Sequence, residues 1–375
     1  MIDGYCASQF VAVRDALVEN LSDDLEIGEA IAISVAGRLV VDLWGGYRDA
    51  GGAQPWAEDT LVCIFSVGKP IAALPLLRLI DRGEVDLQAP VAAYWPEYGA
   101  AGKERTTVDD VVSHLAGIPG VSSLPSGCAY NWDKMIKGIE TQIPLWKPGS
   151  TGCYHTFTYG HLVGELARRV TGKPIDQLVR EEIANPLGVD LAFGLDPDQL
   201  QRCATVSATP GDPLLAAIRD RSLLIGQCWS ALPFGEGEED FNTTAFRTSV
   251  MPSINGHASA RALATLYANL AGVDTTNTPA LLSQKGREMM TTERWHGVDV
   301  LGLNNRMARG VRLSNAYSPF NGNPRSFGHG GIGGAVGFAD PDAQIGLGFV
   351  TNRLVPGPGM SPYAQRLINA LSASL

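Results

Sequence analysis

The sequence predicts an α+β fold, in which one antiparallel sheet is built from both ends of the chain and a helical region is inserted between them. Strand-like runs gather near the two termini, at residues 30–44 and 327–351. Between them, helix-like stretches alternate with loops rich in Pro and Gly. Strands at both ends bury their apolar faces most simply by pairing with each other in one sheet.

The first 44 residues predict a helix followed by a hairpin. Residues 8–21 place Phe10, Val13 and Leu17 at helical spacing. Two apolar runs follow, at residues 30–35 and 39–44, and Ala36-Gly37-Arg38 separates them. A short link that contains glycine between two such runs is typical of a β-hairpin.

The rest of the chain predicts helices in the middle and strands again at the end. Two helices are expected, at residues 159–171 and 257–270, and then strands at 327–329, 335–339 and 345–351, the last two joined by a turn at Asp340-Pro341-Asp342. Residues 362–375 predict a closing helix, so that helices from both termini flank the sheet. We expect a discontinuous sheet domain, residues 1–60 with 300–375, and a mainly helical domain, residues 61–299, with the active site at their interface.

Charge and composition exclude several kinds of partner. The 29 basic and 39 acidic residues give a formal net charge of −10, and no run of Lys or Arg occurs. Nucleic acids and anionic membranes both bind clustered positive charge, so neither is an expected partner. No secretory leader and no apolar run of about 18 residues is recognisable, and the six cysteines form no Cys-x-x-Cys pair. These features favour a cytoplasmic protein with reduced thiols and leave its oligomeric state open.

The first candidate for chemistry is Ser66-Val67-Gly68-Lys69, the only Ser-x-x-Lys in the chain. Residues three apart share one face of a helix, so the amine of Lys69 can approach the hydroxyl of Ser66. A partly desolvated lysine at a helix N-terminus is pushed toward its neutral form, which can accept the serine proton.

A second candidate, Tyr154, stands ahead of the helix expected at residues 159–171. Such a tyrosine is often simply packed. Near a cationic lysine, however, its phenol could be drawn toward phenolate and relay a proton to a leaving group.

The third part is a glycine-rich segment, residues 327–334, which contains His329. Glycines let another group approach the backbone closely and leave N–H groups free to bind an oxyanion. Gly328, Gly330 and Gly333 also fit G-x-G-x-x-G, but a hairpin follows in place of a helix, so a dinucleotide site is not expected.

These three parts, in this order, resemble the serine β-lactamase and penicillin-binding-protein superfamily, and most closely its family VIII carboxylesterases. Further similar stretches are Val41–Gly46, Asp81–Leu87, Ser113–Gly117 and Gly337–Pro341, so that the resemblance covers nearly the whole chain. It implies a β-lactamase/DD-peptidase-like fold, with Ser66 as the acylated nucleophile and Lys69 as its activating neighbour.

The resemblance also implies the remaining site residues. Tyr154 falls on the family's Tyr-x-Asn tyrosine, and His329-Gly330-Gly331 fall on its Lys-Thr-Gly strand motif. The backbone N–H groups of Ser66 and Ile332 would form the oxyanion hole.

Three residues depart from the β-lactamase pattern. Thr156 stands where β-lactamases carry an Asn that contacts the substrate amide, and His329 and Gly330 replace a Lys and a Thr that hold a substrate carboxylate. With that cation and that hydroxyl gone, the expected substrate is a small neutral carboxylic ester. Pro75 is expected to kink the helix that follows Lys69.

Other functions stay open: β-lactam turnover, hydrolysis of D-amino-acid amides or peptides, acyl transfer to another acceptor, and a non-catalytic scaffold on the same fold. No serine has the G-x-S-x-G context of an α/β-hydrolase. The closest histidine pair, His155 and His161, lacks metal-ligand spacing, so neither a metal nor another cofactor is expected. His155 is expected to be a packing residue. Core packing is also the first expectation for three tryptophans that could instead line an acyl pocket: Trp132, Trp146 and Trp229.

Overall fold

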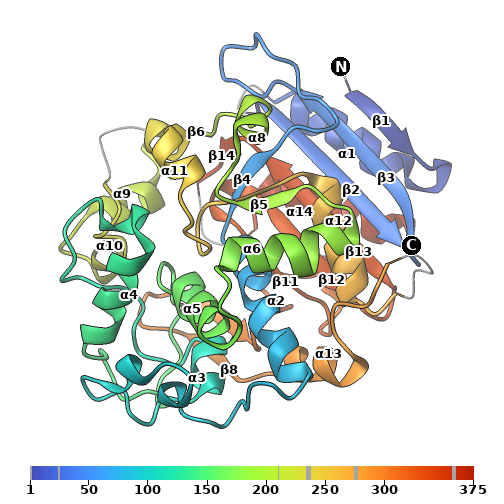
Figure 1. Ribbon diagram of the computed structural model, residues 1–375. Helices are drawn as coiled ribbons and strands as arrows, with labels where there is room; N and C mark the ends of the chain where they lie inside the picture. Colours follow the sequence, from blue (N-terminus) through green and yellow to red (C-terminus); the bar gives the residue numbers. More distant parts are fainter. Residues whose placement is uncertain (1, 24–25, 210, 234–237, 274–277, 357–359) are drawn as a thin grey trace.

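The largest element of the fold is an antiparallel sheet that joins the two ends of the chain (Figure 1). The structure is a computed structural model that describes residues 2–23, 26–209, 211–233, 238–273, 278–356 and 360–375. Within these residues the sheet has nine strands in the order β1-β3-β2-β13-β12-β11-β10-β9-β8. Their bounds are β1 Ile2–Cys6, β2 Gly28–Val35, β3 Arg38–Gly46, β8 Trp295–Val298, β9 Asn304–Met307, β10 Arg312–Leu313, β11 Phe327–Gly330, β12 Val336–Asp340 and β13 Ile345–Thr351.

The pairing of β2 with β13 confirms that both termini build one sheet. Ile345 lies opposite Val35 and Thr351 opposite Glu29, and the register is continuous between these pairs. The strands of this sheet lie within residues 2–46 and 295–351. The domain boundaries near residues 60 and 300 stay a prediction.

The expected hairpin is present and its turn has a local cause. The last residue of β2, Val35, pairs with the first of β3, Arg38. The two residues between them, Ala36 and Gly37, have φ values of 48° and 75°. Two successive positive φ angles form the type I′ turn that matches the twist of the flanking strands.

Helices cover both faces of the sheet, and the side chains of β13 show how. Ile345, Leu347 and Phe349 point into a core formed with α1 (Val11–Leu21) and α14 (Pro362–Ser374). On the other face, α12 (Ala260–Leu270) lies directly on Gly346 and Gly348, where an added methyl group would lie 2.2 Å from the backbone of α12. The alternation of large residues and glycines along this strand therefore sets how closely the two layers approach.

Two predicted helices begin later than expected. Residues 8–10 form a 3-10 turn ahead of α1. The helix expected from residue 257 starts at Ala260, because Ser259 caps it by accepting a hydrogen bond from the Ala262 N–H. His257 instead lies on a strand, β7.

The sequence favoured an all-helical insert within the mainly helical domain, and this expectation is wrong, because the inserted region also contains strands. It contains a three-stranded sheet in the order β4-β7-β5, with bounds Val62–Phe65, Gly256–Ala258 and Leu191–Phe193. A two-stranded parallel pair joins β6 (Ser207–Ala208) to β14 (Arg353–Leu354). Strands of two to four residues are too short to show a period of two in the sequence.

Helices fill the rest of this region around α2, which is almost entirely buried. They are α2 Gly68–Asp81, α3 Val108–Val112, α4 Trp132–Thr141, α5 Tyr159–Thr171, α6 Ile175–Val179, α7 Asn185–Leu187, α8 Pro197–Gln201, α9 Pro213–Arg219, α10 Leu224–Cys228, α11 Thr244–Thr248 and α13 Gln284–Thr291. Pro75 lies inside α2, which continues to Asp81.

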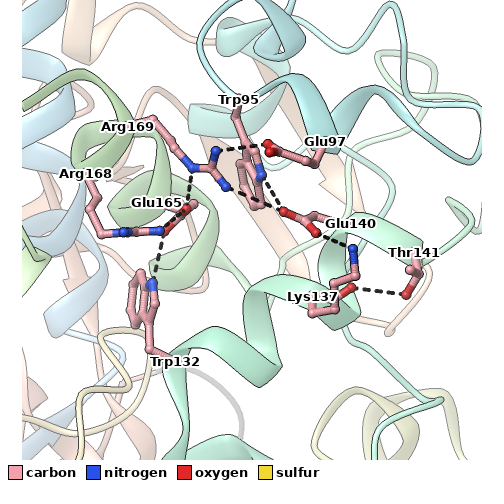
Figure 2. A network of polar contacts seen from close by, with 9 residues as sticks. All are labelled: Trp95, Glu97, Trp132, Lys137, Glu140, Thr141, Glu165, Arg168 and Arg169. Carbon is pink, nitrogen blue, oxygen red and sulfur yellow. Dashed lines mark hydrogen bonds and ion pairs between the residues drawn. The ribbon is translucent and has the colours of Figure 1, made fainter. Parts of the chain in front are cut away.

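A polar network connects α4 and α5 in this region (Figure 2). The fully buried carboxylate of Glu165 accepts hydrogen bonds from Arg168, Arg169 and the indole of Trp132. Arg169 also pairs with Glu97 at 2.9 Å, which ties α5 to the 3-10 turn at Pro96–Gly99. Burial alone would raise the pKa of Glu165, but the hydrogen bonds from its three donors outweigh it and the pKa is lowered. The network holds α5, whose first turn follows the Tyr154 segment.

Candidate active site

Ser66 lies in the turn between β4 and α2, and the backbone around it is unusual. The preceding residue, Phe65, is buried and has a φ of 45°. A bulky side chain in the left-handed region costs about 1–3 kcal/mol, so the surrounding structure must hold it there. Gly331 lies close by, since a methyl group added there would lie 2.5 Å from the carbonyl oxygen of Ile64. The glycine of the strand motif thus lets the end of β11 approach Ser66.

Lys69 lies one helical turn after Ser66, and the structure brings the two together as predicted. Its side chain is fully buried, and Nζ donates hydrogen bonds to Ser66 Oγ at 3.0 Å and to the carbonyl oxygen of Ser253 at 2.9 Å. Burial, and then the positive charge of Arg312, hold the pKa of Lys69 well below its ordinary value. A neutral amine can donate to the Ser253 carbonyl and still use its lone pair to accept the Ser66 proton.

Tyr154 completes the predicted group, but its protonation state differs from the expectation. The Lys69 Nζ lies 4.7 Å from the centroid of its ring. Burial raises the pKa of Tyr154 to about 12, although Arg312 and the nearby Ser66 hydroxyl act in the opposite direction. The expectation that a cationic lysine draws this phenol toward phenolate is therefore wrong. At neutral pH the group is a phenol, which can donate a proton.

The predicted substrate-binding residues line one pocket together with Ser66 and Tyr154. They are Thr156, His329, Gly330, Gly331 and Ile332. His329 is buried, and burial, followed by the charges of Arg312 and Lys69, keeps its pKa well below its ordinary value. It is therefore a neutral imidazole, and its Nδ1 lies 2.7 Å from the carbonyl oxygen of Gly330.

Two backbone N–H groups of this pocket are free. Among the described residues, neither the N–H of Ser66 nor that of Ile332 donates a hydrogen bond to another protein group. Both residues line the pocket. Free N–H groups beside a serine hydroxyl are what an oxyanion hole requires.

The pocket has a volume of about 1060 Å³, open solvent at its mouth included. One wall is apolar and is formed by Leu214, Ile218, Ile225, Trp229 and Leu303. Trp229 therefore lies in the pocket, while Trp132 donates to Glu165 outside it. His155 is fully buried; its Nε2 accepts the N–H of Ile118, and its Nδ1 lies 2.7 Å from the carbonyl oxygen of Cys153.

Sequence reasoning missed Arg312, which is also in the pocket wall. It lies on the two-residue strand β10, and its guanidinium lies 4.5 Å from the centroid of the Tyr154 ring. Its Nε is buried without a hydrogen-bond partner, and no described carboxylate pairs with it. A lone arginine outside any motif gives no signal in one sequence. Arg312 therefore brings a guanidinium into the pocket wall from the strand that pairs with β11.

Three broader properties of the described residues bear on the site. No group of three or more His, Cys, Asp or Glu side chains among them is arranged to hold a metal ion. All six cysteines are free thiols. None of the helices in the described part of the chain combines the length and the apolar character needed to cross a membrane.

Known proteins share this fold and much of this sequence. The Beta-lactamase family matches residues 14–371. Esterase/beta-lactamase LipL of Mycobacterium tuberculosis (strain ATCC 25618 / H37Rv) is 32% identical over 345 residues, which cover 90% of this chain and 80% of LipL. Esterase EstB of Burkholderia gladioli is 29% identical over 223 residues, 54% of each chain.

Solved structures agree with these relatives. A family VIII carboxylesterase superposes with a TM-score of 0.92 at 37% identity, and a penicillin-binding protein homologue from Caulobacter crescentus with 0.89 at 34%; both alignments cover all of both chains. The matches confirm the fold that the sequence motifs implied. The chain belongs to the beta-lactamase family of serine hydrolases.

Proposed function

We propose that this protein is a carboxylesterase that cleaves small neutral esters through an acyl-enzyme on Ser66. The observation that carries the proposal is the 3.0 Å contact between Ser66 Oγ and a fully buried Lys69 Nζ. Burial lowers the pKa of this amine and so favours its neutral, basic form, and the amine lies within reach of the proton that it must remove.

The first half of the reaction forms the acyl-enzyme. Lys69 accepts the Ser66 hydroxyl proton while Oγ forms a bond to the ester carbonyl carbon. The negative charge that develops on the carbonyl oxygen is stabilised by the N–H groups of Ser66 and Ile332. The tetrahedral intermediate then breaks its bond to the alcohol oxygen, which takes a proton from the Tyr154 phenol, and the Lys69 ammonium returns a proton to Tyr154.

The second half returns the enzyme to its starting state. A water molecule gives a proton to Lys69 and attacks the acyl carbon, and the same N–H groups stabilise the second oxyanion. Collapse breaks the bond to Ser66 Oγ, which regains its proton from Lys69, and the carboxylic acid leaves. The apolar wall around Trp229 gives the acyl or alcohol group an apolar surface to lie on.

Two relatives support an ester as the substrate, since LipL is named an esterase/beta-lactamase and the superposed structure is a family VIII carboxylesterase. The proposal can be tested by measuring the intact mass of the protein after treatment with a fluorophosphonate. We expect one adduct that peptide mapping places on Ser66, and none in Ser66→Ala. An adduct on another serine, or an active preparation that forms none, would contradict the proposal.

One observation favours a second substrate class. Arg312 presents to the pocket a guanidinium that pairs with no carboxylate among the described residues, and such a group could hold the carboxylate of a β-lactam or of another anionic acyl compound. A direct comparison of a short aryl ester with a chromogenic cephalosporin distinguishes neutral esters from anionic acyl compounds as the substrate class.

A further inference from the structure

His114 is a buried residue of the segment Ser113–Gly117, which the proposed mechanism does not use. It follows α3 and has a φ of 62°, in the left-handed region. Its side chain is 1% exposed. Histidine tolerates this conformation better than most residues but still adopts it rarely, so its presence there requires contacts that hold it.

Those contacts are with the backbone on both sides of Tyr154. The His114 carbonyl oxygen accepts the N–H of Cys153 at 3.1 Å, and its ring Nδ1 accepts the N–H of His155 at 3.0 Å. Between them, the N–H of Tyr154 donates to Asp299 Oδ2 at 2.9 Å. Three successive N–H groups are thus bound, two of them by His114, and the peptide planes that carry the tyrosine are fixed.

The His114 ring also contacts the tyrosine itself. It stacks on Tyr159 with ring centroids 4.1 Å apart and lies against Tyr154 at 5.2 Å. Because Nδ1 accepts a hydrogen bond, the neutral ring carries its proton on Nε2. A protonated ring would place a hydrogen on Nδ1 and lose the bond to His155. Burial, and after it the neighbouring basic groups His155, Lys69, His329 and Arg312, lower the pKa of His114 well below its ordinary value, which keeps the acceptor available.

We propose that His114 is a positioning residue for Tyr154: it holds residues 153–155 so that the phenol lies where the leaving group needs a proton. This inference rests on the proposed function, because the position of the Tyr154 phenol matters to the reaction only if Tyr154 gives a proton to the leaving group. A displacement of about 1 Å can cost roughly a hundredfold in rate.

The test uses two esters with the same acyl group, 4-nitrophenyl butyrate and methyl butyrate. Departing 4-nitrophenolate needs no proton, whereas methoxide does, so misplacement of the phenol should slow the methyl ester selectively. The ratio of their kcat/KM values reports the acylation half of the reaction. A general loss of folded protein lowers both values and leaves the ratio unchanged.

Two substitutions at His114 separate its side-chain acceptor from its backbone conformation. His114→Gly removes Nδ1 and also relieves the positive φ, whereas His114→Asn keeps an acceptor near the position of Nδ1 and tolerates that φ. We expect the ratio of aryl to methyl ester to rise about tenfold or more in His114→Gly and to stay within about threefold of the wild type in His114→Asn.

A matched control is His161→Asn, since His161 is another fully buried histidine, whose ring lies against Trp132 and Phe157 and, among the described residues, has no ring contact or hydrogen bond to Tyr154. It should lower the melting temperature without changing the ratio. The double variant His114→Gly/Tyr154→Phe should have the same ratio as Tyr154→Phe alone, because a phenol that is absent cannot be misplaced.

The outcomes distinguish the two proposals. If the effects of His114→Gly and Tyr154→Phe multiply, or if His114→Gly leaves the ratio unchanged while Tyr154→Phe raises it, the positioning role is overturned and the relay stands. If Tyr154→Phe itself leaves the ratio unchanged, the relay is overturned and the positioning role with it.

Discussion

Arg312 and Lys69 approach the same ring, with the guanidinium 4.5 Å and Nζ 4.7 Å from the centroid of Tyr154. Arg312 comes from β10 of the large sheet, and Lys69 from α2 of the inserted region. The arginine charge lowers the pKa of Lys69 and also acts to lower that of Tyr154. Arg312 therefore favours the neutral, basic form of Lys69, the form that the proposed reaction needs.

The pH dependence of Arg312→Leu should show this effect. Activity rises as pH rises through the pKa of Lys69, because the neutral amine is the base. Loss of the arginine charge removes one of the causes that lower this pKa, so the acid limb of kcat/KM should move to higher pH. Arg312→Lys keeps the charge and should move the limb less. An acid limb that stays in place in Arg312→Leu would show that Lys69 does not titrate in it.

Lys69→Ala should lower kcat/KM by about 10²- to 10⁴-fold, the usual cost of losing a general base. A matched control is available in Lys103, the other fully buried lysine, whose Nζ donates to the carbonyl oxygens of Glu140 and Gln142. Lys103→Ala should lower the melting temperature but preserve the kcat/KM of the folded protein. Near-wild-type rates in a folded Lys69→Ala variant would remove the base from the mechanism.

Tyr154→Phe should reduce turnover without destabilising the protein. In the described part of the chain its buried hydroxyl makes no hydrogen bond of normal geometry, although the Ser66 hydroxyl lies nearby, so its removal should cost the folded protein little stability. Tyr267 is a buried tyrosine on α12 whose hydroxyl is likewise without a partner in the described part, and Tyr267→Phe is the matched control. Melting curves and esterase rates for both variants show whether the Tyr154 hydroxyl acts in the reaction or in the stability of the fold. A large fall in melting temperature for Tyr154→Phe would mean that the hydroxyl is structural.

The substrate comparison uses a short aryl ester and a chromogenic cephalosporin at pH 7.5. His329 is neutral and Gly330 has no hydroxyl, so two contacts to a substrate carboxylate are missing at the strand motif. Each such bond to a charged group is worth about 1.5–3 kcal/mol, so we expect kcat/KM for the ester to exceed that for the cephalosporin by at least about 10²-fold.

Arg312→Leu extends this comparison to the second substrate class. If Arg312 replaces the missing contacts, cephalosporin efficiency will be comparable to that of the ester and will fall selectively in this variant. Both substrates should be measured on the pH plateau of each enzyme, so that a shift of the acid limb does not enter the ratio.

Glu165→Gln tests the network of Figure 2. Loss of the Glu165 charge should lower the free energy of unfolding by about 1–3 kcal/mol, because the hydrogen bonds that Arg168 and Arg169 donate to residue 165 become weaker. The folded-state pKa of Glu165 is lowered, so its stabilising effect is complete above its unfolded value of about 4.3 and is lost as pH falls through the folded value. Urea unfolding at neutral and acid pH should show the difference between the two proteins shrinking on acidification. A difference that is independent of pH would assign the effect to packing.

Much of this protein could be predicted from local sequence. Ser66, in the turn that leads into α2, and Lys69 meet because residues three apart in a helical turn share one face. The hairpin at Ala36-Gly37 forms because both of these residues adopt positive φ. The terminal strands could be recognised by alternation and length. Local patterns failed where elements are short, since β4, β5 and β7 have three or four residues each. They also placed the start of α12 three residues too early, at residue 257, because they missed the cap at Ser259.

The protonation states and the charge of the pocket were decided only by the tertiary structure. A sequence shows that Lys69 is near Ser66, but not that both are enclosed, and burial is what lowers the pKa of Lys69 and keeps Tyr154 a phenol. It shows that a cation is missing at His329, but not that Arg312 is supplied from the neighbouring strand β10. Desolvation and charge act through space, between residues hundreds of positions apart in the chain, and no spacing along the sequence encodes them.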